Sequence, residues 1–342
     1  MPQHLASIRD TDQLDDLLSE PTPQVLDALR TNSGDLIILG VGGKMGPTLA
    51  RMAQRAADDG RRIIGVSRFS EPGLRQKLDA RGIETIACDL LDDSAVGNLP
   101  DALNVVCMTG MKFGAGGQQP LTWAMNAYLP TVVCRRYPDS RIIAFSTGNV
   151  YPLVSVESGG SVESDELKPI GEYAMSTVGR ERMYEYFSQR NGTPISIVRL
   201  NYACELRYGV LVDLARQVHD GLTIDVSMGH VNVIWQGDAN AQALCSLTDS
   251  ASPAFVVNVG GSEILRIRDV CQRFGELMGK PVQFTGIEAA DALLNNGTMA
   301  RSRYGEERVA SDQLIRWIAD WIERGGESLG KPTHFETRDG KY

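Results

Sequence analysis

Glycines at fixed intervals form the clearest chemical motif of this sequence. Gly40, Gly43 and Gly46 have the spacing G-x-x-G-x-x-G between an apolar run and a helical pattern. In such a loop the first glycine permits a tight turn, the second lets the backbone approach a pyrophosphate, and the third lets the helix pack on the sheet. Free N–H groups at the helix start then bind the phosphates. This context predicts a dinucleotide-binding loop rather than a plain turn, formed by Gly40, Gly42, Gly43, Lys44, Met45 and Gly46.

Ser67 and Arg68 end the next strand-like run, at the position that distinguishes NAD from NADP. NAD sites place Asp or Glu there to bind the ribose 2′-hydroxyl, whereas an arginine suits a 2′-phosphate. Ser67 and Arg68, together with Lys44 of the glycine loop, predict NADP as the cofactor, with NAD as the alternative. The alternative for Arg68 is a solvated loop charge, because arginines are mostly exposed.

Two further strand ends carry residues suited to the same ligand. Asp89 and Leu90 follow the third run, where an acid can accept a hydrogen bond from the adenine amino group. Met108, Thr109 and Gly110 follow the fourth run, where small residues leave room above the sheet. Open α/β sheets bind ligands at the carboxyl ends of their strands, so we expect these five residues to contact the dinucleotide.

These loops need a scaffold that brings several strand ends to one edge. From Asp35 onward, short apolar runs alternate with amphipathic patterns, which is typical of a parallel sheet covered on both faces. We therefore predict an α/β fold, a doubly wound parallel sheet of the Rossmann type with a smaller C-terminal α/β substrate-binding region. The predicted strands are Asp35–Leu39, Arg62–Ser67, Ile83–Ala87, Ala102–Met108, Arg141–Phe145 and Pro194–Leu200, and the predicted helices are Met45–Asp58, Leu74–Ala80, Leu121–Tyr137 and Tyr173–Gln189.

The same patterns divide the chain into three parts. Residues 1–34 are predicted to form an N-terminal helical extension, and residues 35–200 the dinucleotide-binding Rossmann domain. Residues 201–342 are predicted to form mainly the substrate-binding region and C-terminal helices, with some strands returning to the Rossmann sheet. In this last part we predict helices at Tyr208–Asp220, Gly237–Leu247, Ile267–Met278 and Ser311–Glu323, and strands near Leu222–Val226, Asn232–Trp235, Phe255–Val259 and Pro281–Phe284.

Composition argues against several classes of function. The 342 residues include 34 Lys and Arg against 43 Asp and Glu, so the formal net charge is −9, and nonspecific nucleic-acid binding needs a basic surface instead. The apolar runs are far shorter than the roughly 20 residues of a membrane-spanning helix. Six scattered cysteines form no CxxC pair, and no histidine stands at metal-ligand spacing to a cysteine. We therefore expect reduced thiols, no metal, and a cytoplasmic protein.

The sequence resembles the extended short-chain dehydrogenases/reductases, and among them the NAD-dependent epimerase/dehydratase family. The resemblance spans about Asp35 to Trp321 and rests on the order and spacing of several elements together. These elements are the glycine loop, Asp89-Leu90, Asn126, Ser146-Thr147-Gly148-Asn149-Val150-Tyr151, Tyr173, Arg199-Leu200-Asn201-Tyr202, Gln236-Gly237-Asp238 and Val257-Asn258-Val259-Gly260.

The resemblance implies three catalytic residues. Thr147 takes the place of the Ser or Thr that binds the substrate hydroxyl, and Tyr173 that of the catalytic tyrosine. Asn126 lies in the preceding long helical pattern and completes the set. In the family, a lysine four residues after the tyrosine binds the nicotinamide ribose. The resemblance gives that cofactor-binding position to Thr177, which is the largest departure of this sequence from the family pattern.

The missing lysine has a chemical consequence. Threonine can replace a hydrogen bond to the ribose but supplies no charge. A tyrosine ordinarily has a pKa of about 10 and needs a nearby cation to act as a base near neutral pH. Lys112 and Arg180 are candidates for that cation. The alternative for Arg180 is an exposed position on the surface of its helix.

Two functions remain open at this stage. The first is an NAD(P)-dependent epimerase, dehydratase or reductase that acts on a small-molecule substrate: a sugar, a nucleotide sugar or a related carbonyl compound. The second is a catalytically degenerate dinucleotide-binding sensor or scaffold, in which chemistry was lost with the lysine. The predicted helices Leu121–Tyr137 and Tyr173–Gln189 match those that form the dimer interface of the family, so the resemblance implies a homodimer.

Overall fold

Strand β1 (Leu36–Leu39) is buried along its whole length because helices cover both faces of its sheet. Leu36 and Ile38 belong to one apolar cluster, whereas Ile37 and Leu39 belong to another. Successive side chains of a strand point to opposite faces, so this short run contributes to two cores. The computed structural model describes residues 5–112 and 117–340 of the chain.

Seven parallel strands form the central sheet, in the order β12-β7-β5-β4-β1-β2-β3. The order runs outward from β1 in both directions, which confirms the predicted doubly wound arrangement. The six strands predicted before residue 201 are all present, with ends shifted by at most two residues. Besides β1, the strands are β2 (Ile63–Ser67), β3 (Glu84–Ala87), β4 (Asn104–Cys107), β5 (Arg141–Thr147), β7 (Ile195–Leu200) and β12 (Phe255–Val259), the last of which returns from the C-terminal part.

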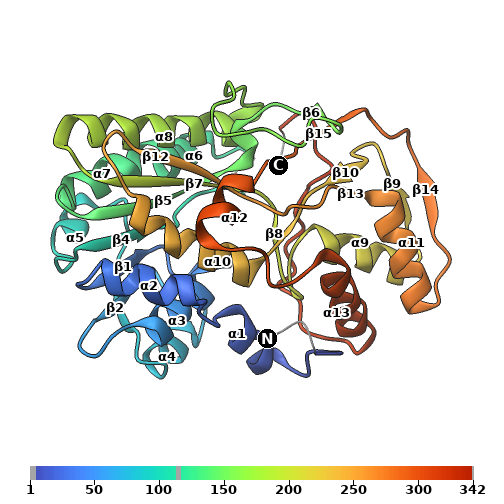
Figure 1. Cartoon of the computed structure of the whole chain (residues 1–342), viewed down its shortest axis with the longest axis horizontal. Helices are drawn as coiled ribbons and strands as arrows, with labels where there is room; N and C mark the ends of the chain where they lie inside the picture. Colours follow the sequence, from blue (N-terminus) through green and yellow to red (C-terminus); the bar gives the residue numbers. More distant parts are fainter. Residues whose placement is uncertain (1–4, 113–116, 341–342) are drawn as a thin grey trace.

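Helices pack on the two faces of this sheet in two separate layers (Figure 1). The cluster that holds Leu36 and Ile38 includes side chains of α2 (Pro23–Thr31), α3 (Gly46–Ala56), α4 (Leu74–Asp79), α10 (Gln236–Cys245) and α12 (Thr298–Tyr304). The opposite cluster includes side chains of α5 (Asp93–Gly97), α7 (Leu129–Arg136) and α8 (Gly171–Asn191). Both layers leave the carboxyl ends of the strands available to the loops.

The predicted helix Leu121–Tyr137 is wrong as a single element. The chain instead forms α6 (Gln119–Trp123), a π-helical turn η2 (Ala124–Tyr128) and α7. Pro130 has no N–H and cannot bond the carbonyl of Asn126, four residues earlier, as a regular α-helix requires. The π-helical turn widens the helix at this point and leaves the Asn126 carbonyl to another donor.

A second lobe lies beside the sheet and has an apolar cluster of its own, on the right in Figure 1. The rings of Trp235 and Trp317 meet edge to face within it, with centroids 5.7 Å apart. Its main helices are α9 (Val210–His219), α11 (Ile267–Met278) and α13 (Ser311–Glu323), and the last two have the predicted bounds. The remaining elements are short strands and 3₁₀ turns: η3 (Gly148–Val150), β6 (Val154–Ser155), β8 (Ala203–Cys204), β9 (Thr223–Asp225), β10 (His230–Val231), β11 (Ile234–Trp235), η4 (Ser246–Asp249), β13 (Leu265–Arg266), β14 (Gln283–Thr285) and β15 (Asp291–Ala292).

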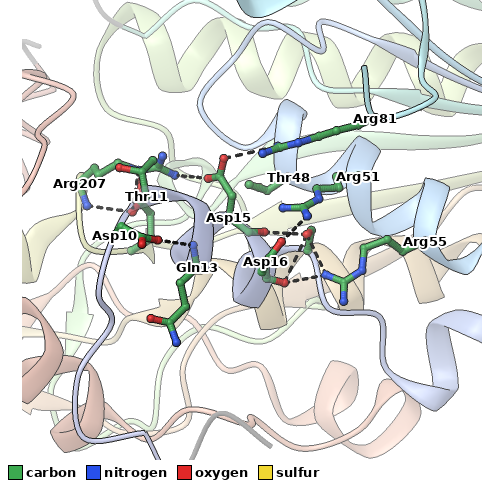
Figure 2. A network of polar contacts seen from close by, with 12 residues as sticks. Asp10, Thr11, Gln13, Asp15, Asp16, Thr48, Arg51, Arg55, Arg81 and Arg207 are labelled. Carbon is green, nitrogen blue, oxygen red and sulfur yellow. Dashed lines mark hydrogen bonds and ion pairs between the residues drawn. The ribbon is translucent and has the colours of Figure 1, made fainter. Parts of the chain in front are cut away.

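The N-terminal segment joins the two lobes. Leu14 and Leu18 of α1 (Thr11–Leu18) are fully buried in the cluster of the second lobe, whereas α2 packs into the cluster under the sheet. Figure 2 shows the polar side of α1, where Asp15 lies between Arg81 and Arg207. Arg81 follows α4 of the sheet domain and Arg207 follows β8 of the second lobe, so one carboxylate binds both parts of the molecule.

Several general properties are visible in the described residues. All six cysteines are buried free thiols. No helix in the described part of the chain is long and apolar enough to cross a membrane. Nor do the described side chains include a group of three or more His, Cys, Asp or Glu placed to hold a metal ion.

Candidate active site

A cavity of about 600 Å³ opens at the carboxyl ends of β1, β4, β5 and β7, where the sheet faces the second lobe. Tyr208 and the first residue of α9, Val210, line it from the second lobe. Eleven of the residues predicted to bind the cofactor or to be catalytic line the same cavity: Gly40, Gly42, Gly43, Lys44, Met45, Gly46, Met108, Thr109, Gly110, Thr147 and Tyr173.

The glycine loop has the shape that a dinucleotide requires. Gly40 has a φ of +91°, and a Cβ there would lie 2.8 Å from the Thr109 side chain. A Cβ on Gly46 would collide with the carbonyl of Val41, so α3 can approach the loop only with glycine there. A Cβ on Gly43 would meet only the Gly40 carbonyl oxygen, at 3.4 Å, which shows open space beside this residue. The loop therefore fits a pyrophosphate beside Gly43 and the start of α3.

A buried ion pair fixes the end of β5, which carries Thr147. Arg199 of β7 binds Glu181 of α8 at 2.8 Å, and the Ser146 hydroxyl donates to the same carboxylate. These contacts connect β5, β7 and α8 beneath the cavity. The Thr147 hydroxyl donates to the Asn149 side chain at 3.1 Å and accepts from its backbone N–H. Thr147 thus sits in a fixed position at the cavity wall.

Tyr173 lies in the first turn of α8 and lines the cavity, but Thr177 does not. Thr177 is fully buried, and its hydroxyl donates to the backbone carbonyl of Tyr173 at 2.9 Å. This bond runs along the helix to the residue four positions earlier and is typical of threonine within helices. The described lining gives no contact by which Thr177 would reach a ribose, so its predicted cofactor role remains untested.

Arg180 is buried at the cavity wall, so the alternative of an exposed surface arginine is wrong. Its guanidinium donates to the carbonyl of Phe145 at 2.8 Å, to the carbonyl of Asn126 at 3.4 Å and to the Asn126 side chain. The Asn126 carbonyl is the one that Pro130 leaves without its helical donor. A Cβ on Gly110 would lie 2.5 Å from the guanidinium, so the space above Gly110 accommodates Arg180.

Asn126 supports this arrangement from behind the cavity. It is fully buried and is not among the lining residues. Its side-chain oxygen accepts from Arg180 and from the Met111 N–H, and its amide donates to the Met111 carbonyl and to the Ser176 hydroxyl. Asn126 therefore positions Arg180 and the loop after β4, and the structure gives it no direct place at the cavity surface.

Two lysines reach the cavity near aromatic rings. The ammonium of Lys44 lies 3.3 Å from the ring centroid of Tyr208, and that of Lys112 lies 5.9 Å from the ring centroid of Tyr173. Burial and the charges of Lys331 and Lys112 lower the pKa of Lys44 to about 7, although Asp213 acts in the opposite direction. Burial lowers the pKa of Lys112 to about 8.

The position of Lys44 corrects one sequence prediction. Lys44 was expected beside Ser67 and Arg68 at the adenosine ribose, but its side chain reaches Tyr208 of the second lobe instead. Ser67 is close to the loop, since a Cβ on Gly42 would lie 2.6 Å from its hydroxyl. Arg68 is exposed, and neither Ser67 nor Arg68 lines the cavity.

The third strand end also lies outside the cavity lining. Leu90 is buried in the apolar cluster of α5 and α7, so its side chain is part of the core. Asp89 is exposed, and its carboxylate accepts from the backbone N–H of Leu91 at 3.1 Å. Its predicted contact with adenine remains a prediction.

Sequence reasoning missed the contribution of the C-terminal strap, by which we mean residues 329–340. Lys331 and Thr333 of this segment line the cavity. Thr333 donates twice to Asp213 of α9, through its N–H at 2.8 Å and its hydroxyl at 2.6 Å, and its carbonyl accepts from the Lys112 ammonium at 3.2 Å. The strap ends against the start of α8, where Gly340 lies in close backbone contact with Gly171. No local pattern in the sequence marks these long-range contacts.

Comparisons with known proteins agree with this architecture. The family model described as NAD dependent epimerase/dehydratase family matches residues 36–235, more than half of the chain. A search of curated protein sequences finds no match.

Solved structures of several sugar-nucleotide enzymes have a similar fold. UDP-glucuronic acid 4-epimerase from Bacillus cereus, in complex with UDP-glucuronic acid and NAD, superposes with a TM-score of 0.71 at 17% identity, over 85% of this chain and 99% of that one. UDP-glucose 4-epimerase from Thermotoga maritima gives 0.72 at 14% identity, over 85% and 99%. The dTDP-glucose 4,6-dehydratase from Bacillus anthracis, in complex with NAD, gives 0.72 at 13% identity, over 85% and 96%. The family match, together with the doubly wound sheet and its glycine loop, shows that the chain belongs to the NAD-dependent epimerase/dehydratase family.

Proposed function

We propose that this protein is an NAD(P)-dependent epimerase, dehydratase or reductase that acts on a sugar, a nucleotide sugar or a related carbonyl compound. One observation carries the proposal: the glycine loop, Thr147, Tyr173 and two cations, Lys112 and Arg180, all line the same cavity. A protein that only held a dinucleotide would need the loop but not the rest of this set. The enzymes with a similar fold are named for UDP-glucuronic acid, UDP-glucose and dTDP-glucose, which are nucleotide sugars.

Each residue has a distinct part in the proposed chemistry. When bound, the nicotinamide accepts or returns a hydride at a substrate carbon. Tyr173 would exchange a proton with the oxygen on that carbon, and Thr147 would orient the oxygen by a hydrogen bond. Lys112, whose ammonium lies 5.9 Å from the Tyr173 ring centroid, would favour negative charge on the tyrosine oxygen. Arg180 would add positive charge at the wall, so that both cations together replace the family lysine.

We also propose that NADP binds in preference to NAD. The residue directly after β2 is Arg68, preceded by Ser67, and neither is an acid that would pair with a ribose 2′-hydroxyl. Arg68 is exposed and thus accessible to a 2′-phosphate. Because Lys44 lies at Tyr208 and not at the end of β2, the preference for NADP rests on the Arg68 guanidinium and the Ser67 hydroxyl.

The decisive experiment separates cofactor binding from turnover. We expect the parent protein to bind NAD(P) in calorimetry and to convert at least one compound in a panel of sugars, sugar acids and nucleotide sugars. Tyr173→Phe should lose turnover about 100-fold or more while retaining cofactor affinity, because a general acid–base group contributes about that factor. Glu185→Gln, a change at a half-buried residue of the same helix that does not line the cavity, serves as the control.

The alternative function predicts a different result. Thr177 supplies no charge and is fully buried, with its hydroxyl bonded to the Tyr173 carbonyl, which is compatible with a catalytically degenerate, dinucleotide-binding sensor. Tight cofactor binding with no turnover across the panel would favour that sensor and contradict the enzyme.

We further propose that the protein is a homodimer in a reducing, cytoplasmic environment. Leu121, Trp123 and Tyr128 on α6 and η2, and Met175 and Tyr186 on α8, are each 38–49% exposed. The two segments pack against each other in sequence-distant contact, and their exposed apolar side chains suit a self-complementary interface. The six buried thiols fit a reducing compartment. Light scattering at micromolar concentration tests the dimer, and Met175→Glu should dissociate it.

A further inference from the structure

Three lysines from distant parts of the sequence line one cavity, and the charges of Lys112 and Lys331 both act on Lys44. Lys44 comes from the glycine loop, Lys112 from the segment after β4, and Lys331 from the C-terminal strap, and all three line the cavity. Lys44 lies over the ring of Tyr208 at 3.3 Å, and Lys112 lies 5.9 Å from the ring centroid of Tyr173. The positive groups therefore gather around the two tyrosines rather than at the end of β2.

The charge of this region is opposite to that of the whole protein. The formal net charge is −9, yet the described residues that line the cavity include Lys44, Lys112, Lys331 and Arg180 and neither Asp nor Glu. Asp213 lies behind the strap, where it accepts two hydrogen bonds from Thr333. Concentrated positive charge in a partly desolvated cavity is unfavourable unless an anion neutralises it.

The strap fixes the position of Lys331. The N–H of Leu329 donates to the carbonyl of Arg207 at 3.1 Å, and Thr333 binds Asp213. Further along, Phe335 is buried in the cluster of the second lobe. Anchors therefore lie on both sides of Lys331 and hold its backbone at the cavity, although the lysine itself is exposed to solvent.

The cofactor does not account for these side chains. A pyrophosphate in this fold binds the backbone of the glycine loop and the start of the following helix. The Lys44 side chain instead extends from that loop to Tyr208 of the second lobe. Lys112 is hydrogen-bonded to the strap and lies beside the tyrosine that carries the proposed chemistry.

We propose that Lys44, Lys112 and Lys331 form an oxyanion subsite, which binds a carboxylate or phosphate group that the substrate carries close to its reacting carbon. The proposal rests on the function proposed above and narrows its substrate class to acidic compounds such as sugar acids or sugar phosphates. The lowered pKa values of Lys44 and Lys112 agree with it, because an anion would return both groups to the charged state that burial disfavours.

Anion titration of the cofactor-loaded protein tests the subsite. Inorganic phosphate and D-glucuronate are the probes, D-glucose is the neutral control, and NADP is kept saturating so that the pyrophosphate site is filled. Lys331→Met and Lys44→Met each remove one ammonium, and Lys280→Met replaces an exposed lysine outside the cavity. Each cavity variant should bind both anions about ten- to hundredfold more weakly, as expected for a lost charge-assisted hydrogen bond. Lys280→Met should bind them like the parent.

Several results would overturn the subsite. They are equal anion affinity of Lys331→Met and the parent, binding of glucose as tight as that of glucuronate, or a loss in the variants of NADP affinity alone. The last result would assign the lysines to the cofactor. Because the titration needs no turnover, anion binding that depends on the lysines in a protein without activity would sustain the subsite and refute the proposed enzyme. Turnover of neutral sugars that is insensitive to Lys331→Met would sustain the proposed enzyme and refute the subsite.

Discussion

Replacement of Lys44 by methionine is expected to stabilise the protein in the absence of ligands, and to do so most at low pH. Methionine keeps an unbranched apolar side chain, one atom shorter than that of lysine, and removes the charge. Burial is the largest cause of the lowered pKa of Lys44, followed by the charges of Lys331 and Lys112, with Asp213 opposing. The folded protein therefore holds a proton on this group less readily than the unfolded chain does.

The direction and the size of this change in the free energy of unfolding follow from proton linkage. Between pH 7 and 10.5 the unfolded chain binds more protons at this position, so the Lys44 contribution to stability rises with pH and is most unfavourable at or below pH 7. At about 1.36 kcal/mol per pKa unit, and after a discount for partial exposure to solvent, the penalty is about 2–3 kcal/mol. Loss of the contact with the Tyr208 ring offsets about 0.5–1 kcal/mol of this. A net gain of about 1–2 kcal/mol at pH 6–7 should remain.

Thermal unfolding of the parent and of Lys44→Met at a series of pH values provides the assay. We expect the midpoint of Lys44→Met to exceed that of the parent by roughly 1–5 °C at pH 6.5, and the difference to shrink towards pH 10. Phosphate should narrow the difference as well, because only the parent keeps the full anion site. A difference that stays constant from pH 6 to pH 10, or a less stable variant at pH 6.5, would show that Lys44 is not a strained buried charge.

Three further predictions concern the cofactor loop and the junction of the lobes. Gly43→Val should abolish dinucleotide binding in calorimetry, because the new side chain would fill the space in which the pyrophosphate is expected to lie. The fold should persist in circular dichroism, because a Cβ at this position meets only the Gly40 carbonyl oxygen, at 3.4 Å. Arg68→Ala should remove most of a roughly ten- to hundredfold preference for NADP over NAD, and equal affinities in the parent would refute that preference. Asp15→Asn should lower the free energy of unfolding by about 1–2 kcal/mol in urea titration, because Asp15 binds Arg207 at 3.0 Å and Arg81 at 3.5 Å; an unchanged midpoint would contradict its bridging role.

Local patterns were sufficient for the sheet and for the glycine loop. Runs such as Leu36–Leu39 are apolar at every position, and a strand buries all of these side chains only when both of its faces are covered. The turn at Gly40 and the close packing at Gly46 are likewise requirements of adjacent backbone. Both depend on residues a few positions apart, which is the range over which sequence spacing determines geometry.

The cations of the site depend on contacts that sequence spacing does not reveal. Arg180 enters the cavity wall because Pro130 leaves the Asn126 carbonyl without a helical donor and because Gly110 has no side chain. These residues lie on three separate segments. Lys331 reaches the site on the C-terminal strap, which lies more than a hundred residues after α9 in the sequence. The strap is bonded to α9 through Thr333, which donates to Asp213. Only the folded chain brings them together.

Under the proposed function, Lys112 and Arg180 supply the positive charge that a lysine at position 177 would otherwise give. A lysine at position 177 would have to fit where a fully buried threonine is bonded to the Tyr173 carbonyl. Arg180, one turn further along α8, is held at the cavity wall by Asn126 and Phe145. Lys112, in the segment after β4, lies 5.9 Å from the ring centroid of Tyr173. We therefore propose that Lys112, with Arg180 at the cavity wall, provides the positive charge near Tyr173. Because Lys112 also donates a hydrogen bond to the strap that carries Lys331, the proposed subsite would couple the electrostatics at Tyr173 to the binding of an acidic substrate group through one side chain.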